Sequence, residues 1–301
     1  MTTAPFTIIT LLSLFAGIVT RNRVLLTAGR RGFYLIAGAL TVSVVGLGGA
    51  FLSEAAYDAE YVFLHSSTSM PTAFQVSGVW AGQVGSILFW TWLISLHGLA
   101  FAFVSRRDPH ERTPWALLIV GLVQLYFVLM VLFLDQNPFR IWETSELVAM
   151  LLSRADGLIS TGDQALAWLQ SATVAGGDLA LIELIPPSVV AELQAIGANA
   201  LPDRLDPSAL GTLAVEGAHA AGYGVAANGQ GLNPLLVNYW IAIHPPAMYT
   251  GLIATTIVFA IAVGALIKGD TDRWVIDVRP WLIWAWLFLT VGNILGGLWA
   301  Y

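Results

Sequence analysis

Long apolar stretches separated by short polar segments dominate this chain. Six of them contain no Asp, Glu, Lys or Arg, and they cover residues 5–20, 32–53, 74–105, 114–134, 239–267 and 281–301. Most of them reach the roughly 20 residues that a helix needs to cross the hydrocarbon core of a bilayer. The pattern predicts an all-α fold, a polytopic membrane helical bundle with about six transmembrane helices.

The first stretch, 5–20, is short enough to be compared with a secretory signal peptide. A signal peptide carries positive charge before its apolar run, whereas Arg21 and Arg23 follow this one directly. We therefore interpret it as a retained helix whose amino end lies outside.

The positive residues predict the direction of the helices, because positively charged loops stay in the cytoplasm. Ten of the 13 Lys and Arg residues follow the first, third and fifth stretches, namely Arg21, Arg23, Arg30, Arg31, Arg106, Arg107, Arg112, Lys268, Arg273 and Arg279. The alternate loops hold only Arg140, Arg154 and Arg204 among many acids. We expect a multi-pass protein of the bacterial inner (plasma) membrane with both termini extracytoplasmic.

One large segment, 135–230, separates the fourth stretch from the fifth. Amphipathic pieces such as 145–154 and 188–196 predict a small extracytoplasmic helical insertion, and a poorly ordered insertion is the alternative. The expected organisation is transmembrane helices 1–4 in 1–134, the insertion in 135–230, and helices 5–6 with a histidine motif in 231–301.

Composition agrees with a lipid environment and excludes several kinds of chemistry. The chain of 301 residues is 57% hydrophobic and 11% charged, whereas a soluble chain carries about 25% charged residues. It has no cysteine, which excludes disulfides and thiolate metal sites. A net charge of −6 argues against nucleic acid as a partner.

Two segments on the predicted outer side are unlike ordinary membrane helix. Residues 80–86 join Trp80 to several small residues, which suits close approach of a helix or a ligand. His244 stands before Pro245 and Pro246, which leave preceding carbonyls free. A histidine there suits a metal ligand, although a lone histidine more often has a backbone partner.

The last stretch and the other histidines carry weaker signals. Its outer half contains Gly292, Gly296, Gly297 and Trp299, which predict tight packing, and an interfacial anchor is the alternative for its inner tryptophans. We expect His97 to hydrogen-bond across helices. His65 lies in the first outer loop, and we expect His110 and His219 in loops.

Several motifs together carry a family resemblance. They are 61–71 (YVFLHSSTSMP), 80–90, Asn137-Pro138-Phe139, 231–236 (GLNPLL), His244-Pro245-Pro246, Arg279-Pro280-Trp281 and 292–301. In order and spacing the chain resembles the N-terminal portion of the CcmF, NrfE and CcsA family of cytochrome c haem lyases. The match covers nearly the whole chain outside the insertion.

The resemblance implies a specific function. Family members hold haem at the outer membrane surface between two histidines that flank a tryptophan-rich segment, and they join its vinyl groups to the cysteines of a CxxCH motif. His244 inherits the role of the first axial ligand to the haem iron, with the rings of Trp80 and Trp240 beside the porphyrin. Haem b is then substrate and cofactor, and the implied partners are a haem chaperone, apocytochrome c and the thiol-handling protein that presents it.

The sequence also departs from the family pattern. The segment 80–86 lacks the acid that the family usually has there. The tryptophan-rich segment would follow Tyr301, so either the chain is a fragment or a second chain carries that segment. The insertion, from about 143 to 228, is longer than the family connection, and we expect it to pack over the haem face or to meet a partner.

A membrane transporter or a respiratory-complex subunit without haem is the alternative function. Such proteins keep charged residues within their spans, and the six stretches contain none. No residue is an evident catalytic acid or nucleophile, so positioning of haem beside the thiols would supply the rate. We interpret the chain as a component of a haem lyase (holocytochrome c synthase) that is incomplete as an enzyme.

Overall fold

The computed structural model describes residues 3–53, 58–108, 110–134, 136–153, 159–174, 179–223, 228–270 and 272–301. Its contacts divide the chain into two compact units. The first unit contains Met1–Gly48, Val79–Asn137 and Asn233–Tyr301, and the second contains Gly49–Gly78 and Pro138–Leu232.

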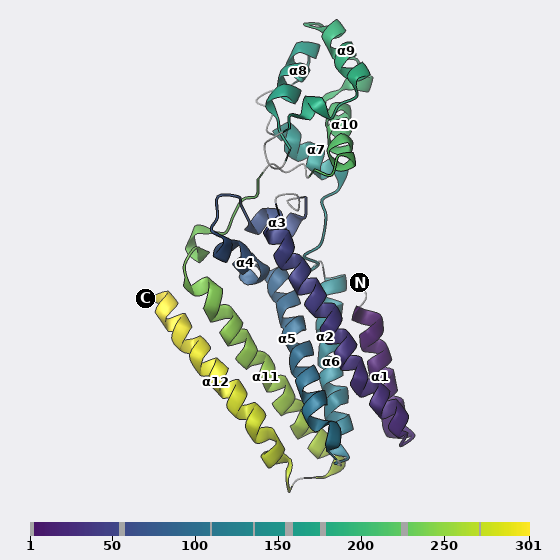
Figure 1. The fold of residues 1–301 in the computed structure, drawn as a ribbon, viewed down its shortest axis with the longest axis vertical. Helices are drawn as coiled ribbons and strands as arrows, with labels where there is room; N and C mark the ends of the chain where they lie inside the picture. Colours follow the sequence, from purple (N-terminus) through teal and green to yellow (C-terminus); the bar gives the residue numbers. More distant parts are fainter. Residues whose placement is uncertain are drawn as a thin grey trace. The chain divides into compact units, whose positions relative to one another are not determined.

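The first unit is a bundle of long apolar helices (Figure 1). They are α1 (Thr3–Val19), α2 (Arg23–Phe51), α5 (Gln83–Val104), α6 (Arg112–Phe133), α11 (Trp240–Lys268) and α12 (Trp274–Ala300). Five of these are long and apolar enough to cross a membrane, and α1 is a shorter apolar helix. The predicted polytopic membrane bundle is therefore confirmed.

The apolar stretch 74–105 was expected to form one transmembrane helix, but the structure divides it into two helices. It forms α4 (Thr72–Ala81) and α5, and Gly82 between them is extended, with φ −112° and ψ 165°. The Ser86 hydroxyl donates to the carbonyl of Trp80 at 2.8 Å, which satisfies an end group that α4 leaves open. The break at Gly82 thus has its own hydrogen bonds.

Charged residues join the loop between α5 and α6 to the loop between α11 and α12 at one end of the bundle. Arg112, whose side chain is 2% exposed, forms ion pairs with Asp270 and Asp277. Lys268 Nζ lies 2.6 Å from Glu111 Oε2. These pairs join the start of α6 to the end of α11 and the start of α12, where most of the positive residues lie.

The second unit is built from short helices. They are α3 (Glu60–His65), α7 (Thr144–Ser153), α8 (Gly162–Ser171), α9 (Pro187–Ile196) and α10 (Pro207–Ala220). Thr161 and Gln164 form a capping box at α8, and the Asp206 carboxylate caps α10. The insertion has its own apolar core, which includes Leu147, Trp168, Leu193 and Leu210. Its predicted helical character is therefore confirmed.

His219 is a local exception to the expectations from sequence. It lies inside α10 and not in a loop, because α10 continues to Ala220. Its Nε2 atom is 2.8 Å from Asp58 Oδ2, and this pair joins the insertion to the segment after α2. The predicted loop position of His219 is wrong, whereas His110 lies in a loop as expected.

Candidate functional site

The first turns of α11 are shaped by two prolines inside the helix. Pro245 has no N–H group, so it cannot donate to the carbonyl of Ile241 four residues earlier. The indole Nε1–H of Trp80 donates to that carbonyl instead, at 2.8 Å. The freed carbonyl predicted from the paired prolines therefore anchors α4 to α11.

His244 projects from these turns toward α12. Its Nδ1 atom is 2.8 Å from the backbone carbonyl oxygen of Gly292. A carbonyl can only accept, so Nδ1 carries the proton and the lone pair of the neutral ring is on Nε2. Within the described residues no hydrogen bond to Nε2 is present. A histidine held in this way through one ring nitrogen is preorganised to bind a metal through the other.

Two glycines of α12 let it lie close to α11, and one of them, Gly296, makes room for the imidazole. A Cβ atom at Gly292 would lie 2.7 Å from Met248 Cα, and one at Gly296 would lie 2.7 Å from His244 Cε1. The ring of Trp299 stands edge-on to the imidazole, with 5.5 Å between ring centroids. The half-buried imidazole of His244 is thus held against the C-terminal half of α12.

Trp240 is the first residue of α11, four residues before His244. Residues at this spacing lie on one side of a helix, so its half-buried indole and the imidazole share a face. Trp80 reaches the same turns through Ile241. The first turns of α11 therefore gather the three residues singled out in the sequence, and their aromatic rings and single imidazole are chemically suited to a porphyrin.

Some contributors to this site escaped the sequence analysis. The glycines and Trp299 were expected to pack tightly, but their contact with His244 was not foreseen. Gly292 acts through its carbonyl, a group that every residue has, so no sequence signal marks it.

The remaining histidines have other partners. His97 Nε2 accepts from the indole N–H of Trp284 at 3.3 Å, which confirms the expected hydrogen bond across helices. His65 belongs to the second unit and lies over Tyr61, with 4.4 Å between ring centroids. Burial lowers the pKa of His65, against a smaller opposing effect of its hydrogen bond to the Tyr61 carbonyl.

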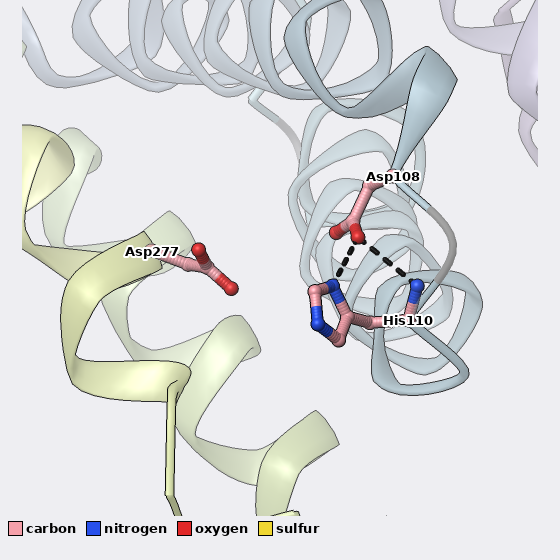
Figure 2. Close-up of side chains that lie close together, drawn as sticks. All are labelled: Asp108, His110 and Asp277. Atoms are coloured by element: carbon pink, nitrogen blue, oxygen red, sulfur yellow. Dashed lines mark hydrogen bonds and ion pairs between the residues drawn. The ribbon is translucent and has the colours of Figure 1, made fainter.

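A second cluster lies at the opposite end of the first unit. Figure 2 shows Asp277 of α12 facing Asp108 and His110, a set whose ligand atoms lie within 4.8 Å of one another. Burial raises the pKa of Asp108, but hydrogen bonds from Thr113 and His110 more than offset it and leave the pKa lowered. Arg112 is already paired with Asp277 and would repel a cation there. We assign this cluster a structural role.

Comparisons with known proteins agree with the predicted resemblance. Residues 80–301 match the family model for the cytochrome C assembly protein. The cytochrome c-type biogenesis protein NrfE of Haemophilus influenzae is 26% identical over 95% of this chain and 32% of its own length. CycK of Rhizobium meliloti is 47% identical over 74 residues, which are 24% of this chain and 11% of CycK.

One solved structure supports the fold. The cytochrome c haem lyase CcmF matches with a TM-score of 0.61 and 18% identity, covering 99% of this chain and 34% of that chain. This chain thus spans about a third of the length of NrfE and of the solved CcmF chain. The family model covers most of the sequence, and the chain belongs to the cytochrome c assembly protein family.

Proposed function

We propose that the chain is a haem-handling subunit of the cytochrome c maturation system. In this proposal it holds haem b at the outer membrane face for covalent attachment to apocytochrome c. The observation that carries the proposal is the hydrogen bond from His244 Nδ1 to the Gly292 carbonyl, which leaves the Nε2 lone pair for iron. The names of the relatives, which concern cytochrome c biogenesis, support the same assignment.

The residues around His244 have separate tasks in this proposal. His244 holds the iron as an axial ligand, and Trp80 and Trp240 offer ring surfaces to the porphyrin. Haem supplies the vinyl groups that react with the thiols of the apocytochrome. The chain itself binds and orients, because positioning the reactants can replace much of the work of a catalytic group.

The placement of His244 supports an outer site. It lies 24 residues before the end of α11 at Lys268, or about 36 Å along the helix axis. The positive residues near Lys268 favour a cytoplasmic location for that end. We therefore place His244 and both termini on the extracytoplasmic side of the inner membrane, where a haem chaperone and the thiol-handling partner of apocytochrome c would meet it.

Haemin titration of the purified full chain in detergent tests the proposal. The titration contains no added imidazole, because free imidazole would ligate the iron by itself, and a shift of the Soret band on binding reports ligation by the protein. We expect His244→Ala to weaken haemin binding by roughly 10- to 100-fold and to lose that shift. His110→Ala, at the other end of the bundle, is the matched control and should bind as the wild type does. Equal binding and spectra in wild type and His244→Ala would refute the assignment.

The insertion contributes a further expectation to this proposal. We expect deletion of 143–228 to lower cytochrome c maturation in cells, because this segment covers the haem face or binds a partner. Unchanged maturation and haem retention after the deletion would remove that role from the insertion.

A further inference from the structure

One face of α12 carries polar and small residues that no described residue covers. Trp286, Asn293 and Gly297 follow one another at spacings of seven and four, so they lie along one side of the helix. Trp286 is 65% exposed, and a Cβ atom at Gly297 would meet nothing within 4 Å. Asn293 is also exposed. We call these three residues the α12 stripe.

The α12 stripe is unlike a surface made for lipid. The side-chain amide of Asn293 donates to the Leu289 carbonyl of its own helix at 2.8 Å, and no described residue donates to its Oδ1 atom. An amide oxygen left unpaired in hydrocarbon is strongly unfavourable. Trp286 lies twelve residues into the helix, about 18 Å along its axis, whereas tryptophan prefers the membrane interface.

The burial of α12 also sets it apart from the other spans. In its most apolar window only 11% of the residues are buried, against 33% to 61% in the other four candidate spans. Small residues that permit close approach and polar side chains that bond across helices are the features that join transmembrane helices. The α12 stripe has a small residue at Gly297 and a polar side chain at Asn293. Neither feature stabilises contact with lipid chains.

We propose that the α12 stripe docks a membrane-spanning helix from the part of a CcmF- or NrfE-type protein that this chain does not span. That helix places a small residue against Gly297 and a hydroxyl or amide donor against Asn293 Oδ1. NrfE is about three times as long as the matched region, so about two thirds of such a protein lie outside the match. The choice of partner rests on the proposed function. The features of the α12 stripe are independent of that function.

The docked helix would lie beside the proposed haem site. Asn293 directly follows Gly292, whose carbonyl holds His244 Nδ1. The stripe thus gives the docked helix a defined position next to the proposed axial ligand. Gly292 and Gly296 face α11, so the two sides of α12 serve different contacts.

Site-specific photocrosslinking in native membranes tests this docking. A photoreactive amino acid replaces Ile294, which is 59% exposed beside Asn293, in the full chain. We expect crosslinks, identified by mass spectrometry, to an apolar peptide from the unmatched part of a CcmF- or NrfE-type sequence. The same probe at Val42, which is 73% exposed on α2, is the control and should reach only lipid.

Variants of the stripe make the test specific. In the chain with the probe at 294, Asn293→Leu should lower the crosslink yield roughly tenfold, and Asn293→Gln should retain most of it. Crosslinks only to lipid or to a second copy of this chain would overturn the proposal, as would an unchanged yield in Asn293→Leu. Introducing His244→Ala into the chain with the probe at 294 separates the docking proposal from the haem proposal. If this variant loses haemin binding but keeps the crosslink, the change concerns the haem site alone.

Discussion

Single residues control where the imidazole of His244 points. Because a Cβ atom at Gly296 would lie 2.7 Å from His244 Cε1, we expect Gly296→Ala to displace the ring. Haemin binding, measured by titration without added imidazole, should weaken at least about tenfold, the size of effect known for groups that orient metal ligands. Gly46→Ala is the control, since its Cβ atom would meet nothing within 4 Å. Unchanged binding in Gly296→Ala would mean that the glycine does not position the ring.

His65 is a second single residue with a testable effect, because it should make the stability of α3 depend on pH. Burial lowers its pKa in the folded chain, so above the unfolded value of about 6.5 the ring is neutral in both states and contributes no pH dependence. As pH falls below that value the unfolded chain binds the proton first, and the stability of α3 decreases toward the folded pKa. Hydrogen exchange of the α3 amides, corrected for intrinsic rates, should show this decrease. The same measurement on His65→Asn should show a flatter pH profile.

At the scale of helices, Trp80 and Pro245 form a coupled pair across α4 and α11. Trp80→Phe removes the N–H that satisfies the Ile241 carbonyl, and we expect it to lower the free energy of unfolding by about 1–3 kcal/mol. Pro245→Ala restores a backbone donor for that carbonyl, so Trp80→Phe should be less destabilising in that background. Equal losses in both backgrounds, measured by unfolding in detergent, would show that the two residues are independent.

Arg112, at the start of α6, is paired with Asp270 of the loop between α11 and α12 and with Asp277 of α12. Removing one partner of a fully buried ion pair costs about 3–5 kcal/mol. Since Asp270 and Asp277 are 31% and 40% exposed, Arg112→Met should cost less than that but still lower the midpoint of thermal unfolding. Arg204→Ala is the control, because the pair of Arg204 with Glu192 is exposed and is worth at most about 1 kcal/mol. A midpoint in Arg112→Met as high as in Arg204→Ala would contradict the structural role of this cluster.

For the whole molecule, the distribution of positive residues predicts how the chain is oriented in the membrane, with both termini outside the cytoplasm. The chain has no cysteine, so single cysteines report their own exposure. We expect Tyr301→Cys to react with a membrane-impermeant maleimide from outside the cytoplasmic membrane, and Arg107→Cys to react only after lysis, because positive loops remain in the cytoplasm. The reverse labelling pattern would invert the orientation and place His244 on the cytoplasmic side.

The class of the protein could be predicted from its sequence. Apolar length predicted the membrane helices, because hydrocarbon requires long uncharged segments. Short amphipathic periods such as 188–196 predicted α9 of the insertion within a residue or two. The resemblance to the haem lyase family could also be recognised from local motifs, since each motif consists of consecutive residues. Even the freed carbonyl beside Pro245 followed from the missing N–H of proline.

How separate segments of the chain meet could be learned only from the folded structure. It broke the stretch 74–105 at Gly82, which hydropathy alone treats as continuous. It also gave His244 its tautomer through a carbonyl 48 residues away, and placed Arg112 between Asp270 of the α11–α12 loop and Asp277 of α12. Backbone carbonyls and long-range ion pairs leave no local pattern, because the chain must first fold to bring them together.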